Sequence, residues 1–119
     1  MPSRVLVVED EEDIAVLVAL LLRDRGMEVA TAADGRAALA EVERAMPDLI
    51  LLDMKMPVMD GPAFAQAFRA RWGRAAPLVA FTAAEDADRR AAAIDADASL
   101  GKPFDLPQLV ALVERFVKR

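Results

Sequence analysis

Leu49-Ile50-Leu51-Leu52-Asp53 is the stretch of sequence on which the fold depends. Four bulky apolar residues between Pro47-Asp48 and Pro57 predict a short strand that is buried on both faces. Strands of that kind are typical of parallel sheets covered by helices on both sides. A charge is costly inside such a strand, so we expect Asp53 to lie at its exposed end.

The same succession of an apolar run and a polar residue occurs three more times. The runs are Val5-Leu6-Val7-Val8 before Glu9-Asp10, Leu78-Val79-Ala80-Phe81 before Thr82, and Ala98-Ser99-Leu100-Gly101 before Lys102. In a parallel sheet the carboxyl ends of the strands share one edge, where ligands of open α/β folds bind. We therefore expect these polar residues to converge.

Helical patterns alternate with the apolar runs. We expect strands near residues 4–9, 28–32, 48–53, 77–82 and 97–101. The first helix places Ile14, Leu17, Val18, Leu21 and Leu22 on one stripe and stops at Gly26. The second spans about 34–45, the third starts after Asp60-Gly61 with Pro62 in its first turn, and the fourth spans about 86–95. The fifth follows Asp105 as N-cap and buries Leu106, Leu109, Val110, Val113, Phe116 and Val117.

This alternation predicts an α/β fold: a doubly wound, five-stranded parallel (βα)5 sheet between two layers of helices. The strand order 2-1-3-4-5 is borrowed from flavodoxin-like folds, and the sequence alone does not establish it. With 119 residues we expect one domain over 1–119.

Composition narrows the function classes. A net charge of −5 without a basic stripe argues against direct nucleic-acid binding. The chain has no histidine and no cysteine, which excludes a Ser-His-Asp triad, a cysteine nucleophile and the usual zinc sites. The lack of cysteine also agrees with a cytoplasmic protein, and no apolar run approaches the roughly 20 residues that span a bilayer.

Glu9, Asp10 and Asp53 would form a cluster of three carboxylates. Like charges at that distance raise one another's pKa unless a cation joins them, and Mg²⁺ prefers such oxygen ligands. One carboxylate can then act as a nucleophile toward phosphorus, while Lys102 and Thr82 contact the phosphoryl oxygens. Ala83 is small enough to leave the phosphoryl group room.

Four motifs give the chain a resemblance to the receiver domains of two-component response regulators, the CheY-like fold. They are Val7-Val8-Glu9-Asp10-Glu11, Leu52-Asp53-Met54-Lys55-Met56-Pro57 with Met59-Asp60-Gly61, Thr82-Ala83, and Lys102-Pro103-Phe104. Each motif alone is weak, but all four in order and at these intervals are highly specific. The resemblance covers nearly the whole chain.

The resemblance implies a phosphorelay switch rather than an enzyme in the usual sense. Asp53 would accept a phosphoryl group from a sensor histidine kinase or a histidine phosphotransfer protein. Asp10 would bind Mg²⁺ directly, Glu9 through water and Lys55 through its backbone carbonyl. The Lys102-Pro103 bond would be cis. Signals would leave through the face formed by the fourth helix, fifth strand and fifth helix, toward an unknown partner.

Three positions depart from the commonest form of this family. Glu9 stands where aspartate is more frequent, and Ser99 stands where an aromatic ring usually couples phosphorylation to the outer face. We therefore expect the output to depend on backbone movement of the loop between the fourth strand and fourth helix. Lys55 and Ala84 occupy the positions where the family varies its dephosphorylation rate.

Other functions remain open at this point. The chain could be a degenerate receiver that binds partners without phosphorylation, and Ser99 is the main reason to consider it. An aspartyl phosphatase or mutase often has a second aspartate where this chain has Lys55. A flavin or nucleotide site would need glycines where the first turn is acidic. Taken singly, each polar strand end could also be an ordinary capping or surface residue.

Overall fold

The computed structural model describes residues 2–117 and contains the predicted parallel sheet, with strand order β2-β1-β3-β4-β5. The strands are β1 (Arg4–Val8), β2 (Glu28–Ala32), β3 (Leu49–Leu52), β4 (Leu78–Ala83) and β5 (Ala98–Lys102). The helices are α1 (Glu12–Asp24), α2 (Gly35–Arg44), α3 (Gly61–Trp72), α4 (Ala87–Ala93) and α5 (Leu106–Val117), with a 3₁₀ turn η1 (Ala84–Asp86) before α4.

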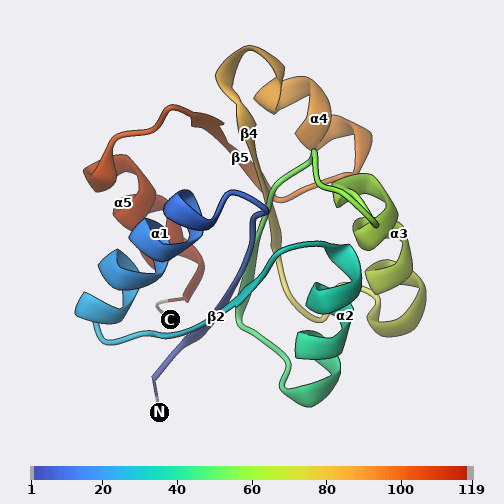
Figure 1. Ribbon diagram of the computed structural model, residues 1–119, viewed down its shortest axis with the longest axis horizontal. Coiled ribbons are helices and arrows are strands. Elements are labelled where there is room, and N and C mark those ends of the chain that lie inside the picture. Colours follow the sequence, from blue (N-terminus) through green and yellow to red (C-terminus); the bar gives the residue numbers. More distant parts are fainter. Residues whose placement is uncertain (1, 118–119) are drawn as a thin grey trace.

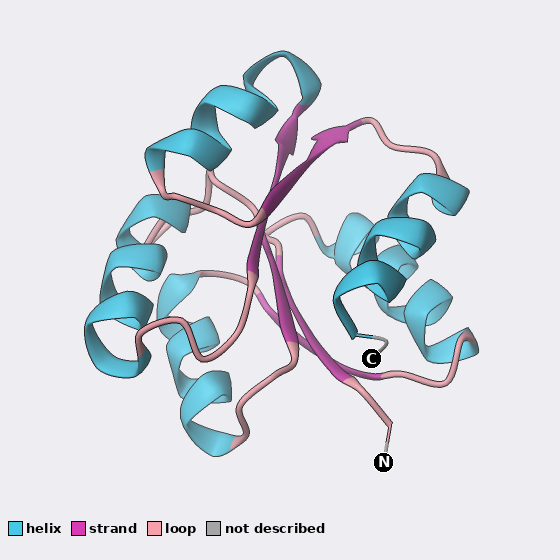
Figure 2. Ribbon diagram, turned by 180° about the vertical axis from the view of Figure 1, so that it is seen from behind, coloured by secondary structure: helices cyan, strands magenta, loops and turns pink. Residues whose placement is uncertain are grey.

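Helices cover both faces of the sheet. In Figure 1, α1 and α5 lie on the left of the sheet and α2, α3 and α4 on the right, and Figure 2 shows the same layers from behind. Successive side chains of a strand point to opposite faces of the sheet. Ile50 and Leu52 of β3 join the core under α2, α3 and α4, whereas Leu49 and Leu51 join the core under α1 and α5.

Local signals set the ends of the helices. The side chains of Asp34, Asp60 and Asp105 each accept a hydrogen bond from the backbone N–H three residues later, which caps α2, α3 and α5. Gly26 follows α1 with φ +86°, a conformation that glycine adopts without strain. The predicted N-cap at Asp105 and the stop at Gly26 are therefore confirmed, and Asp60 caps the helix that was expected to start after it.

Three expectations about burial were wrong. Leu17 on α1 is 46% exposed and Leu106 on α5 is 40% exposed, although both fit the helical stripe. The sheet covers only the part of α1 that carries Ala15, Val18, Ala19 and Leu22. Asp53 lies at a strand end as predicted, but only 4% of it is exposed.

The segment from β4 to α4 differs most from its expected form. The fourth helix is α4 (Ala87–Ala93), a little shorter than the expected 86–95, and the turn η1 before it was not predicted. A side chain at Gly101 would approach the Ala84 Cα to 2.6 Å, so η1 lies directly on the backbone of β5. At the other end of α4, Arg69 of α3 donates to the carbonyl oxygens of Ile94 and Asp95, both at 3.1 Å.

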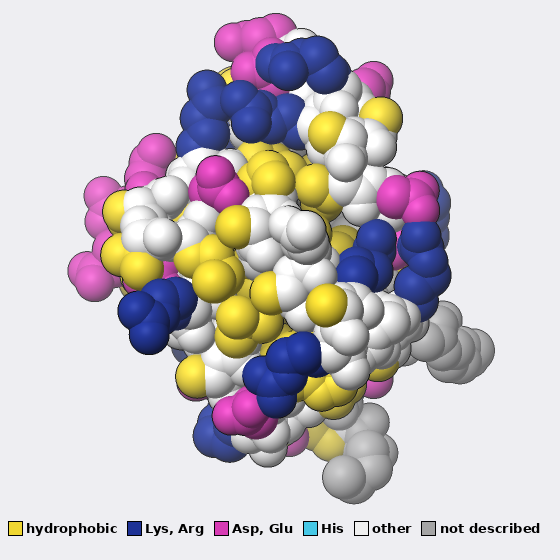
Figure 3. Space-filling view, turned by 90° about the vertical axis from the view of Figure 1, so that its right-hand side faces the viewer, with side chains coloured by type: hydrophobic (Ala, Val, Ile, Leu, Met, Phe, Trp, Pro, Cys, Tyr) yellow, Lys and Arg dark blue, Asp and Glu magenta, His cyan; other side chains and the backbone are white. Residues whose placement is uncertain are grey.

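The outer surface of α2, α3 and α4 is mixed in character. Figure 3 shows hydrophobic side chains near the middle of this side, with Lys, Arg, Asp and Glu around them. Within residues 2–117, no helix is both long enough and apolar enough to cross a membrane.

Candidate functional site

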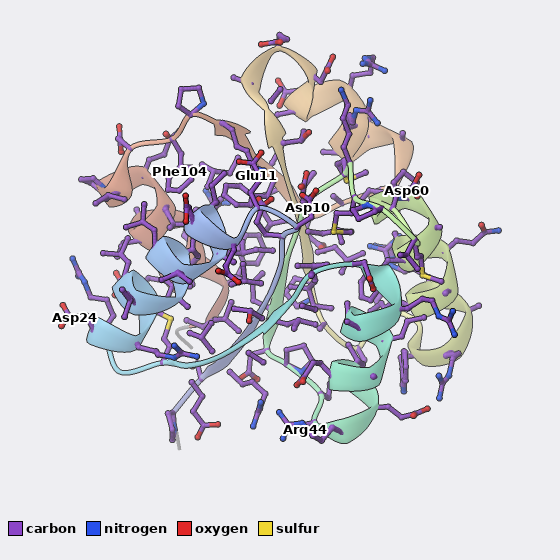
Figure 4. All side chains as sticks on the ribbon, viewed as in Figure 1. Asp10, Glu11, Asp24, Arg44, Asp60 and Phe104 are labelled. Carbon is purple, nitrogen blue, oxygen red and sulfur yellow. The ribbon has the colours of Figure 1, made fainter. Side chains whose placement is uncertain are left out.

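Backbone pairing between β1 and β3 brings the predicted carboxylates together. Val8 pairs with Leu52, so the residues that follow them, Glu9 and Asp53, lie side by side. The N–H of Asp53 also donates to the Val8 carbonyl at 2.9 Å, which continues the ladder past the strand end. Carboxylate oxygens of Glu9, Asp10 and Asp53 all lie within 4.8 Å of one another. Figure 4 labels Asp10 and Glu11 in the loop between β1 and α1.

Lys102 supplies positive charge to this cluster from β5. Its Nζ lies 2.5 Å from Oε1 of Glu9 and 3.6 Å from Oδ2 of Asp53. The ammonium group also lies 4.9 Å from the centre of the Phe81 ring, within range of a cation–π contact. The ammonium group of Lys102 therefore lies closer to Glu9 than to Asp53.

The two buried carboxyl groups have unusual proton affinities. Burial is the largest cause that raises the pKa of Glu9 from 4.5 to about 7, and the negative charge of Asp53 adds a smaller increase. Burial likewise raises the pKa of Asp53, against the hydrogen bond from the Lys55 N–H and the charge of Lys102. Removal from water, more than mutual repulsion, thus makes these groups hard to ionise.

A hollow of about 450 Å³ opens above Asp53. Its lining residues are Asp10, Glu11, Ile14, Asp53, Lys55, Thr82, Ala83, Lys102 and Pro103. Thr82 and Ala83 reach it because β4 pairs with β5, with Thr82 opposite Gly101 and Ala83 opposite Lys102. The Lys102–Pro103 peptide bond is cis, as the resemblance implied.

Ser99 does not belong to this hollow. It lies on β5, opposite Ala80, and its hydroxyl donates to Oδ1 of Asp88 on α4 at 2.9 Å. The structure therefore brings together every predicted site residue except Ser99. Lys55 is exposed at the rim, where its N–H donates to Oδ1 of Asp53 at 3.2 Å.

The residues fit a hard divalent cation. Three carboxylates from two loops offer oxygen ligands within one small volume, and the ligands that such ions prefer are oxygens. Because burial makes the ionised forms of Glu9 and Asp53 costly, a cation would stabilise them. The same arrangement can bind the negatively charged oxygens of a phosphoryl group beside Lys102.

Two contacts were missed by sequence reasoning. Phe81 appeared only as an apolar strand residue, although its ring contacts both Lys102 and the ring of Phe104, 5.2 Å away. Strand alternation could have placed Phe81 under α5, but no pattern marks a cation–π contact. Asp88 carried no signal at all, because its pairing with Ser99 depends on where α4 packs.

Comparisons with known proteins agree on one family. Residues 5–114 match the model of the response regulator receiver domain. The "Transcriptional regulatory protein PrrA" of Mycobacterium tuberculosis is 42% identical over 118 residues, which are 98% of this chain and 50% of that protein. The chain thus spans about half the length of the curated relatives that it matches first.

Solved structures give the same result. A putative response regulator from Chloroflexus aurantiacus superposes with a TM-score of 0.90 at 30% identity, covering 100% of both chains. The chemotaxis response regulator CheY4 of Vibrio cholerae superposes with a TM-score of 0.87 at 36% identity, covering 98% of this chain and 99% of CheY4. With the matching motifs and sheet order, these comparisons show that the chain belongs to the response regulator receiver domain family of two-component systems.

Proposed function

We propose that Asp53 is the phosphoacceptor of this receiver. A carboxylate oxygen of Asp53 attacks the phosphorus of a phosphohistidine; the new O–P bond forms as the P–N bond breaks, and the histidine leaves. The observation that carries this proposal is the position of Asp53 in the hollow, with Glu9 and Asp10 nearby and Lys102 3.6 Å away.

Mg²⁺ is the cofactor that we propose for this reaction. Glu9, Asp10 and Asp53 would hold it together with the backbone carbonyl of Lys55, and the ion would neutralise charge on the transferring phosphoryl group. The cluster of three carboxylates supports this assignment.

Lys102 and Thr82 complete the phosphoryl pocket in this proposal. The lysine neutralises charge on Asp53 and then on the phosphoryl oxygens, while the Thr82 hydroxyl donates to one of them. Ala83 and Pro103 line the same hollow and leave it open. The retention of all these groups in one place argues against a degenerate receiver, the remaining alternative.

The partners follow from the same proposal. A sensor histidine kinase or histidine phosphotransfer protein in the cytoplasm donates the phosphoryl group, and the face formed by α4, β5 and α5 contacts the output partner. We also propose that residues 1–119 act as a single receiver domain, as the match over 5–114 supports.

Intact mass after incubation with Mg²⁺ and acetyl phosphate tests this function. The unaltered protein should gain one phosphoryl group, whereas Asp53→Asn should gain none. Omission of Mg²⁺ should abolish the gain as well. If acetyl phosphate is inactive, the cognate kinase replaces it as donor. An equal gain in Asp53→Asn, or no gain from either donor, would overturn the assignment.

A further inference from the structure

A hydrogen bond between Ser99 and Asp88 joins β5 to α4. Each is the second residue of its element, and the Ser99 hydroxyl donates to the Asp88 carboxylate at 2.9 Å. Neither residue lines the hollow above Asp53. The contact therefore takes no direct part in the proposed chemistry. It lies on the segment that follows Thr82 and β4, and this position indicates a different role.

Beyond the pairing of β4 with β5, the chain from η1 into the first turn of α4 lies along β5, and two of its contacts are specific. The first is the close approach of Ala84 to Gly101. The second, one helical turn further on, is the bond between Asp88 and Ser99. If phosphorylation draws Thr82 toward the phosphoryl group, this segment would move with it, because only Ala83 separates Thr82 from η1.

Apart from the bond to Ser99, the first turn of α4 has an ion pair between Arg89 and Asp86 of η1 at 2.7 Å, which stays within the segment and does not join it to β5. The helix has seven residues, and the buried ones are the small Ala87 and Ala91. Ile94, a larger apolar residue, lies at the opposite end, which Arg69 also holds. Segments with few buried apolar contacts open easily, so loss of one hydrogen bond at this turn should have a measurable effect.

We propose that the Ser99–Asp88 hydrogen bond links movement of Thr82 to the position of α4 on β5. While the bond is made, α4 and β5 act as one surface; when Thr82 moves, the bond yields and the first turn of α4 separates from β5. This inference rests on the proposed phosphorylation of Asp53. In it, the hydrogen bond is a polar link between α4 and β5 within the output face.

Hydrogen exchange without Mg²⁺ or phosphoryl donor tests the link itself. Ser99→Ala and Asp88→Ala should each speed amide exchange at residues 87–93 by about three- to tenfold, the effect of one lost hydrogen bond. Ser99→Thr keeps the hydroxyl and should retain slow exchange, since a hollow of about 320 Å³ beside position 99 accommodates a methyl group. Arg44→Ala breaks another exposed pair, with Glu41 on α2, and should leave α4 unchanged.

Exchange in the presence of Mg²⁺ and acetyl phosphate tests the signalling role, with intact mass reporting phosphorylation. Phosphorylation should speed exchange of α4 in the unaltered protein but change it less than about twofold in Ser99→Ala, where the bond is already lost. An equal change in both proteins would overturn the link, as would slow exchange in Ser99→Ala without donor. A failure of the unaltered protein to gain mass would instead count against the proposed function, and the first experiment would still decide whether the bond holds α4.

Discussion

Glu9 and Asp53 are carboxyl groups that water barely reaches, with exposed fractions of 2% and 4%. Without a metal ion, the folded protein binds the Glu9 proton more tightly than the unfolded chain, since the pKa is about 7 against 4.5. The contribution of Glu9 to stability is therefore full below about pH 4.5 and is lost as the pH rises through about 7.

This raised pKa predicts pH-dependent binding of Mg²⁺. A metal ion needs the ionised carboxylates, so protons compete with it. Between pH 6 and pH 8 the affinity for Mg²⁺, measured by isothermal titration calorimetry, should rise about tenfold, since a group with a pKa near 7 goes from mostly protonated to mostly ionised. Glu9→Gln should bind more weakly and with a smaller pH dependence. An equally steep dependence in Glu9→Gln would contradict this account.

For single residues, the sequence identified the reactive side chains of the site but not how deeply they are buried. Glu9, Asp53, Thr82 and Lys102 could be found because each follows or ends an apolar run, and parallel pairing brings such ends together. The burial of Asp53 could not be found in the same way. The next residue, Met54, is also buried, and no local pattern in the sequence encodes how this loop packs.

At the scale of the elements, the start of α3 depends on one side chain, that of Asp60. Asp60 accepts a hydrogen bond from the Ala63 N–H at 3.0 Å, and Figure 4 labels it at the start of this helix. Asp60→Ala should lower the free energy of unfolding in urea by about 1 kcal/mol, because the N–H loses its acceptor. Asp60→Asn keeps an acceptor and should retain most of the stability. Equal losses in the two variants would show that the cap does not set this stability.

Element boundaries were predictable where one residue decides them and less so where packing does. Capping side chains and Gly26 act locally, so their positions in the sequence suffice. The turn η1 before α4 was not predicted: its Ala84 lies against Gly101, 17 positions away along the chain, and the two residues meet only in the folded sheet. Leu17 is a second example of a feature that packing decides. Its spacing fits the apolar face of α1, but how much of that face is buried depends on the sheet.

For the whole molecule, α1 offers a matched comparison of buried and exposed leucine. Leu22 is fully buried against the sheet, and Leu17 on the same helix is 46% exposed. Leu22→Ala should lower the free energy of unfolding by about 2–5 kcal/mol through lost burial and the cavity left behind. Leu17→Ala should change it by less than about 1 kcal/mol. Urea denaturation of both variants measures the difference, and similar losses would contradict the assigned burial.

Arg69 gives the molecule a fixed point. By holding the carbonyl oxygens of Ile94 and Asp95, it fastens the end of α4 that lies furthest from Thr82. With seven residues at a rise of 1.5 Å each, α4 is about 10 Å long, and it would pivot about the end that Arg69 holds. A displacement of about 1 Å at the free end would then tilt the helix axis by about 5–6° over that length. The exposed Arg89 would be reoriented rather than carried sideways, so a small movement at Thr82 would become a change of angle on the outer surface.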